Sequence, residues 1–195
     1  MPNWCENKVR LNHSDIAMLE RAKTAFENRA FLKEFIPIPE DLHNTDHAYY
    51  PVGSAEWDER ERNVKENVAK YGYSDWYDFA NAEWGTKWDV GGDDAEAELV
   101  DGVLHLDFDS AWSPPIEAYE KLAKMGFDIE AYFYEAGCAF CGIFVGNEEY
   151  TEFDEYGIEG DAAWVTRHIP SAIDEEFAIS ERMFEWEKEQ AEEDL

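Results

Sequence analysis

The segment that most constrains the fold lies in the middle of the chain, over residues 84–126. Residues 95–100 and 103–109 both alternate polar and apolar side chains, as half-buried strands do. Asp101-Gly102 between them is typical of a two-residue hairpin turn, because both residue types tolerate positive φ. Ser113 and the proline after it then favour the start of a helix. The segment predicts a β-hairpin followed by an amphipathic helix.

The remaining segments add strands and helices to this hairpin. They are, in order, a strand over 7–11, a helix over 14–29, a helical insertion over about 43–83, strands over 127–135 and 140–145, and an acidic C-terminal helix over about 171–193. The order strand, helix, hairpin, helix, strand is typical of a ferredoxin-like (split βαβ) domain. Right-handed crossovers would place both helices on one face of an antiparallel sheet, with strand order fourth, first, third, second. We therefore expect an α+β chain whose residues 1–195 form a single ferredoxin-like domain.

The C-terminal helix has its own start signal. Ser171 follows a proline and precedes Asp174 by three residues, which is the spacing of a capping box. Its predicted apolar face, which we expect to dock on the domain, comprises Ile173, Phe177, Ile179, Met183, Phe184 and Trp186.

The charge of the chain is extreme, with 46 acidic side chains against 16 Lys and Arg and a formal net charge of −30. Residues 1–100 hold 21 acids and 11 bases, whereas residues 101–195 hold 25 acids and 5 bases. Over a compact chain about 40 Å across, this is about 0.7 charge per Å, close to the value of about 0.6 for duplex DNA. We therefore expect no direct binding to nucleic acid, and binding to a basic protein surface instead. Solubility or a salt-rich habitat would also explain the charge.

The predicted partner-binding residues are acids in two segments. The first segment is the acidic turn or edge strand over 147–161, and the second is the outer side of the C-terminal helix. The residues are Glu148, Glu149, Glu152, Asp154, Glu155, Glu159, Asp161, Glu175, Glu181, Glu185 and Glu189. The same helix could equally serve a homodimer.

Several classes of protein are disfavoured by the sequence. No apolar run approaches the roughly 20 residues of a membrane span, and the first residues lack the apolar core of a secretory signal. Three cysteines without such a signal favour a reducing cytoplasm. No phosphate-binding loop, nucleophile elbow or HExxH motif occurs, so we expect neither enzyme activity nor a cofactor.

One face of the predicted hairpin allows two interpretations. Its outward residues are Glu96, Glu98, His105, Asp107 and Asp109, and the predicted strand order places Lys8 and Arg10 between His105/Asp107 and Asp128/Glu130. A solvated ladder of ion pairs is the favoured interpretation. The alternative is an acidic cleft of a small-ligand hydrolase, in which Asp107, Glu130 or Glu98 would act with His105.

Three further motifs leave alternatives open. Cys138 and Cys141 form a single CxxC in strand-like sequence, which favours buried structural cysteines without metal, although a metal or redox site is the alternative. WGTKWD and SAWSPP favour tryptophan packing that anchors the insertion. The alternative is a small pocket with polar contacts from Thr86, Lys87, Asp89 and Ser110.

Five motifs together resemble the YubB-like family of uncharacterised phage and conjugative-plasmid proteins. They are MPNWCENKVRL, FIPIPEDL, WGTKWD, SAWSPP and YEAGCAFCGIF, which span residues 1–146. The resemblance implies a ferredoxin-like domain and a mobile-element origin, and it implies no catalytic residues. With the charge, it leads us to expect a nucleic-acid mimic or counter-defence inhibitor that occupies a basic site on a nucleic-acid-binding host protein.

Overall fold

The computed structural model describes residues 3–45 and 48–193. Its strands are β1 (Trp4–His13), β2 (Glu96–Val100), β3 (Val103–Ala111), β4 (Phe127–Glu135), β5 (Phe140–Gly146) and β6 (Thr151–Gly157). Its α-helices are α1 (Ile16–Glu27), α2 (Phe31–Phe35), α3 (Ala55–Tyr71), α4 (Trp76–Glu83), α5 (Ile116–Lys124), α6 (Ala162–His168), α7 (Ser171–Phe177) and α8 (Ile179–Glu193), and a short 3₁₀ helix covers Glu40–His43.

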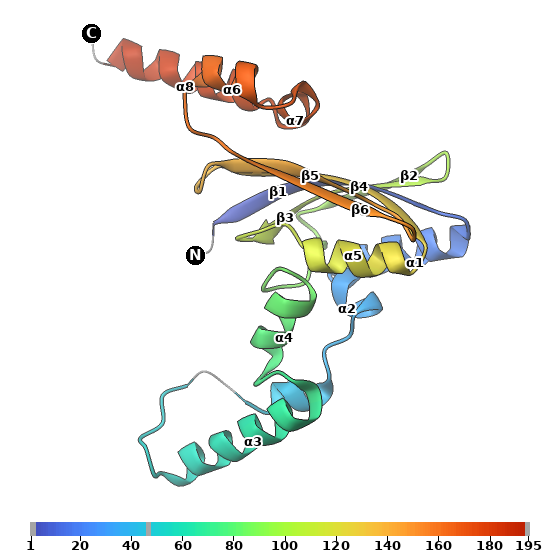
Figure 1. The fold of residues 1–195 in the computed structure, drawn as a ribbon, viewed down its shortest axis with the longest axis vertical. Coiled ribbons are helices and arrows are strands. Elements are labelled where there is room, and N and C mark those ends of the chain that lie inside the picture. The colour runs from blue at the N-terminus through green and yellow to red at the C-terminus, as the bar shows by residue number, and fades with distance from the viewer. Residues whose placement is uncertain (1–2, 46–47, 194–195) are drawn as a thin grey trace.

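The strands form one antiparallel sheet in the order β2-β3-β1-β4-β5-β6 (Figure 1). Its first four positions have the strand order expected of a ferredoxin-like domain, which confirms the predicted fold class. β5 and β6 then extend the sheet beyond β4, and β6 is the outer strand. Because β1 lies between β3 and β4, the segments before and after the helical insertion share one sheet.

The hairpin has the predicted turn and register. Asp101 and Gly102 have φ of 50° and 84°, the two positive values that a type I′ turn requires, and Val100 lies opposite Val103. This register directs Leu104 and Leu106 into the core.

The helices α1 and α5 cover one face of the sheet, as predicted from right-handed crossovers (Figure 1). This α1/α5 face holds the largest apolar cluster, in which Phe26 and Leu19 of α1 and Tyr119 and Leu122 of α5 are at most 1% exposed. Side chains of β1 such as Val9 complete it, so hydrophobic burial holds this layer together.

The insertion projects away from the sheet on the α1/α5 side (Figure 1). Ser54 accepts a hydrogen bond from the backbone N of Trp57 at the start of α3, and Gly72 ends that helix with φ of 85°. Trp84 is 3% exposed and donates from Nε1 to the carbonyl of Ile36, so it fixes the end of α4 to the domain as expected.

The other face of the sheet, which we call the C-terminal face, is covered by α6, α7 and α8 (Figure 1). Tyr132, Tyr134 and Cys141 on the sheet pack there against a second apolar cluster from these helices. The expectation of one continuous helix over 171–193 is wrong. Ala178 has φ of 50°, outside the helical region, and separates α7 from α8. The sequence analysis also missed α6.

Two predicted helix starts are wrong in detail. Asp174 does not cap α7; its carboxylate accepts from the backbone N (2.7 Å) and the Oγ (2.6 Å) of Ser180, and so satisfies donors in the first turn of α8. Ser113 does not cap α5 either, because its Oγ donates to the carbonyl of Gly85 at 2.7 Å.

In residues 3–45 and 48–193, no helix is long and apolar enough to cross a bilayer.

Candidate protein-interaction surface

All eleven predicted partner-binding acids are exposed, on β6 and its flanking turns and on α7 and α8. Within the described part of the chain, none of them forms an ion pair. Asp161 also has a structural role, since its carboxylate accepts from the backbone N of Trp164 (2.8 Å) at the start of α6. Glu152 accepts a long hydrogen bond from the Tyr150 hydroxyl at 3.4 Å. The predicted surface therefore consists of carboxylates left to solvent.

The first acidic segment is uninterrupted by basic residues. Residues 125–166 contain ten acidic side chains and no Lys or Arg. β6 places part of this charge on the outer edge of the sheet, where Glu152, Asp154 and Glu155 are all exposed. Within residues 125–166, no Lys or Arg offsets these neighbouring negative charges.

The helix α8 combines acidic and exposed aromatic side chains. Glu181, Glu185 and Glu189 recur at intervals of four residues and so follow one line along the helix. Phe184 and Trp186 are 62% and 61% exposed, so the prediction that they dock on the domain is wrong. The reason is the break at residue 178, which restarts the helix in a new direction.

The other predicted apolar residues of this region do pack against the sheet. Ile173, Phe177 and Ile179 are buried, and Met183 is partly buried beside them. They hold α7 and the start of α8 on the C-terminal face, with the acidic line of α8 left on the outside.

The ladder predicted on the hairpin face forms only in part: Arg10 pairs with Glu130, whereas in the described residues Lys8 forms no ion pair with the Asp107 opposite it. The outward hairpin residues are exposed as expected, but Lys8 and Arg10 are partly covered. Lys8 lies opposite Asp107, and Arg10 lies opposite His105 and Glu130, with 2.7 Å between Arg10 Nη1 and Glu130 Oε1. α7 covers these cations. Glu176 accepts from Lys8 Nζ through its backbone carbonyl at 2.6 Å and pairs with Arg10 through its carboxylate.

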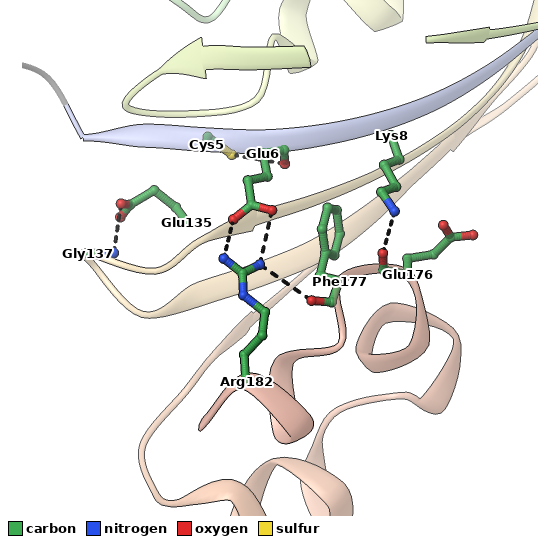
Figure 2. A network of polar contacts seen from close by, with 8 residues as sticks. All are labelled: Cys5, Glu6, Lys8, Glu135, Gly137, Glu176, Phe177 and Arg182. Atoms are coloured by element: carbon green, nitrogen blue, oxygen red, sulfur yellow. Dashed lines mark hydrogen bonds and ion pairs between the residues drawn. The ribbon is translucent and has the colours of Figure 1, made fainter. Parts of the chain in front are cut away.

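A second polar contact fixes α8 to the same face (Figure 2). The guanidinium of Arg182 donates two hydrogen bonds to the carboxylate of Glu6, at 3.0 and 3.1 Å, and a longer one to the carbonyl of Phe177. The guanidinium carbon also lies 5.5 Å from the ring centroid of Tyr134. Hydrogen bonding to Glu6 raises the pKa of Arg182. Sequence reasoning missed this pair because its residues are 176 positions apart.

Of the three carboxylates proposed for a hydrolase, Asp107 and Glu98 share a small polar cavity of about 210 Å³ with His105, whereas Glu130 does not line it. It is lined on the hairpin side by Glu96, Glu98 and Asp107, and both of its cations are bound by α7. Burial raises the pKa of Asp107, and the nearby Lys8 opposes that rise. Glu130 is turned to Arg10.

The CxxC cysteines do not share an environment. Cys141 is buried on the C-terminal face, and burial raises the pKa of its thiol to about 12. Cys138 lies in the turn before β5 and is exposed, so the expectation that both are buried is wrong for this residue. Its Sγ accepts a hydrogen bond from Asn3 Nδ2 at 3.3 Å. Residues 3–45 and 48–193 contain no cluster of three His, Cys, Asp or Glu side chains able to hold a metal.

The pocket residues proposed from WGTKWD and SAWSPP are mostly structural. Thr86 Oγ1 donates to the carbonyl of Ala111, and the buried Ser110 Oγ accepts from Asn7 Nδ2 and donates to the carbonyl of Ser113. The carboxylate of Asp89 accepts from three backbone N–H groups, at residues 32, 33 and 90, while burial raises its pKa.

Lys87 differs from these residues because its ammonium lies over aromatic rings. Nζ is 4.5 Å from the ring centroid of Trp88 and 5.4 Å from that of Trp112. Both tryptophans remain about 40% exposed. The ring of Trp112 nevertheless contacts Tyr77 of α4 edge-on, with 6.5 Å between centroids, so it packs on the insertion as predicted, whereas Trp88 contacts Trp4 of β1 instead.

The family model described as the ferredoxin-like domain in Api92-like protein matches residues 83–194, which is more than half of the chain. A crystal structure of the protein api92 from Yersinia pseudotuberculosis is similar with a TM-score of 0.45 and 12% sequence identity, covering 82% of this chain and 100% of that chain. No curated protein matches the sequence. The YubB-like assignment and the mobile-element origin stay predictions. By its family match, the chain belongs to the Api92-like proteins that carry this ferredoxin-like domain.

Proposed function

We propose that the chain is an acidic binding protein that occupies a basic, nucleic-acid-binding site on a host protein. The observation that carries this proposal is the set of eleven exposed carboxylates without an ion-pair partner in the described residues. A partner that presents Lys and Arg at the spacing suited to phosphates would be attracted over the range of the Debye length, about 8 Å at physiological ionic strength. With a mobile-element origin, this would make the protein a nucleic-acid mimic or counter-defence inhibitor.

The acidic line on α8 lowers the stability of that helix in the free protein. Like charges at positions i and i+4 destabilise a helix by about 0.2–0.5 kcal/mol per pair. Glu181, Glu185 and Glu189 form two such pairs. A basic partner would remove this repulsion, so the charge pattern favours binding over stability of the isolated chain.

Phe184 and Trp186 supply an apolar part of the same surface. Aromatic side chains at the centre of an interface commonly contribute most of the binding energy, while charged residues around them set rate and specificity. Four glutamates at 181, 185, 187 and 189 outnumber Arg182 and Lys188 around them on α8, which favours a basic partner over a second copy of this chain.

We further propose that the chain has no catalytic activity. The carboxylates of the hairpin face lie beside cations that α7 engages, and the cavity there is small. Turnover of any small ligand that is lost specifically on Asp107→Asn or Glu130→Gln would contradict this proposal.

The experiment is an affinity capture from bacterial lysate with two charge-reversal variants. One variant changes Glu181, Glu185 and Glu189 to Lys. The control changes Glu20, Glu66 and Glu120 to Lys, which are exposed on α1, α3 and α5 and alter the net charge equally. We expect the first variant to lose its partner and the control to retain it, with binding by the unmodified chain weakening steeply between 50 and 500 mM salt.

Competition with duplex DNA tests whether the protein occupies the nucleic-acid site of its partner or binds elsewhere on it. If the partner uses its nucleic-acid site, an excess of duplex DNA should displace the protein. Displacement by neither DNA nor salt, together with equal capture by both variants, would mean that the charge only maintains solubility.

A further inference from the structure

The strand β3 is longer than its neighbour β2 and leaves part of its edge without a strand partner. β2 pairs with residues 103–107 of β3, whereas β1 pairs with residues 104–111 on the other side. Residues 108–111 therefore have a neighbouring strand on one side only.

The chain before β2 is held away from this edge. The backbone N of Ala95 donates to the carbonyl of Gly92 at 3.1 Å, so a turn over residues 92–95 ends the approach to β3. Gly92 N in turn donates to the carbonyl of Phe26 at 2.9 Å, and Arg29 Nε donates to the carbonyl of Gly91. A Cβ on Gly91 would lie 2.1 Å from the Phe26 carbonyl oxygen, so only glycine permits this contact with α1.

The result is an edge groove of about 660 Å³ between β3 and the segment 88–95. Phe108, Asp109, Ser110 and Ala111 form one wall in unbroken sequence, and Trp4 and Trp88 lie at its end with ring centroids 6.0 Å apart. Both tryptophans are partly exposed, at 47% and 39%.

The hairpin register tells which backbone groups point into the groove. A two-residue type I′ turn makes Val100 and Val103 a hydrogen-bonded pair, so every second residue of β3 directs its N–H and C=O away from β1. Asp109 and Ala111 are such residues. Thr86 Oγ1 donates to the Ala111 carbonyl, whereas the N–H and C=O of Asp109 and the N–H of Ala111 face the groove, where the described residues place no strand beside them.

We propose that this edge groove binds an extended basic peptide segment of a partner protein, which adds to β3 as a short strand in line with β2. Strand addition uses exposed main-chain donors and acceptors for affinity and side chains of alternate residues for specificity. The groove offers three such main-chain groups in a row, and its aromatic end suits the aliphatic stem of a long side chain.

The charges around the groove favour arginine or lysine in the peptide. Asp109 is exposed on the C-terminal face beside Glu6 and Asp107, and burial together with these two carboxylates raises its pKa. Asp94 is exposed at the rim, with Arg29 as its neighbour at 3.6 Å. A guanidinium beside Asp109 would compensate its charge, and Trp4 offers a ring face for cation–π contact, whereas the ring of Trp88 already carries the ammonium of Lys87.

Two capped heptapeptides test the proposal with the unmodified protein. One alternates valine and arginine (Val-Arg-Val-Arg-Val-Arg-Val), and the other replaces each valine by proline and so keeps the charge but loses strand-forming N–H groups. We expect the valine peptide to bind at least tenfold more tightly. Amide hydrogen exchange should slow at residues 109 and 111 when it binds. Equal affinity of both peptides, or protection at β6 instead of β3, would overturn the proposal.

Matched substitutions at one position separate the backbone from the carboxylate. Asp109→Asn keeps the main-chain donor and should weaken the valine peptide about threefold to tenfold. Asp109→Pro also removes the backbone N–H that faces the groove, and it leaves the hydrogen bonds between β3 and β1 intact. This variant should bind the valine and proline peptides equally. If it does not fold, the amide exchange of residues 109 and 111 in the unmodified protein decides.

The peptide binding proposed for the edge groove and the partner binding proposed for the acidic surface can be tested independently. Reversal of Glu181, Glu185 and Glu189 should leave the preference for the valine peptide unchanged. Loss of that preference in the reversal variant would assign the peptide to α8 and overturn the edge groove.

Discussion

The two faces of the sheet are covered by helices in different ways. On the α1/α5 face, large apolar side chains such as Phe26, Tyr119 and Leu122 are fully buried. On the C-terminal face, a smaller apolar cluster is supplemented by the pair of Arg182 with Glu6 and by the contacts of Glu176 with two cations. Hydrophobic burial therefore dominates one interface, whereas the interface that carries the acidic helices depends partly on charges that salt and pH affect.

The largest expected effect is the loss of stability caused by a cavity in the core of the α1/α5 face. Phe26→Ala should lower the free energy of unfolding by about 3–5 kcal/mol, because it leaves a cavity that the surrounding side chains cannot fully fill. Urea denaturation measures this change. Ile16→Ala on the same helix is the control, since Ile16 is 51% exposed and should change stability by about 0.5 kcal/mol or less.

A core substitution on the C-terminal face should have a more local effect. Ile173 is 1% exposed, and Ile173→Ala should weaken the docking of α6, α7 and α8 by about 2–4 kcal/mol. We expect faster amide exchange and proteolysis in these helices, with β1 still protected. Equal loss of protection in β1 would mean that the two faces unfold as one unit.

The ion pair between Arg182 and Glu6 should contribute less. Its side chains are 51% and 39% exposed, so Arg182→Gln should cost about 1 kcal/mol at most, seen as faster exchange in α8. The loss should shrink in 1 M salt, where screening has already weakened the pair. Lys188→Gln removes a more exposed cation, 4.0 Å from Glu192, and should have no comparable effect.

The smallest expected effect concerns Asp109 and has a defined pH dependence. Its pKa is raised in the folded protein, so its charged form lowers stability once the pH rises above the ordinary aspartate value of about 3.9 and through the raised pKa. Asp109→Asn should therefore stabilise the protein at pH 7, by less than about 1 kcal/mol because the side chain is exposed. Thermal unfolding at pH 7 and pH 3 checks this, and a gain that persists at pH 3 would contradict it.

Local sequence signals predicted the ferredoxin-like part of the fold well. The hairpin over residues 96–111 is determined by the turn residues between its strands, which is why the alternation of polar and apolar residues located it. The cap at Ser171 failed because Asp174 has a competing set of donors at Ser180, a contact that no local pattern reveals.

The candidate site was predictable only in its composition. Exposure of the eleven acids followed from their charge, since unpaired carboxylates are rarely buried. The position of the helices that carry them did not follow, because it depends on long-range contacts such as Arg182 with Glu6 and on the left-handed backbone at Ala178. The edge groove depends on the difference in length between β2 and β3, which only the strand register shows.

The acidity of β6 has one consequence that does not require a partner. β6 is one of the two outer strands of the sheet, and an outer strand is a template on which other chains can pair and aggregate. Glu152, Asp154 and Glu155 place three negative charges within its seven residues, so two such edges repel each other when they meet. At neutral pH these carboxylates therefore oppose the pairing of one sheet edge with another. Acidification, which protonates them, would remove this repulsion.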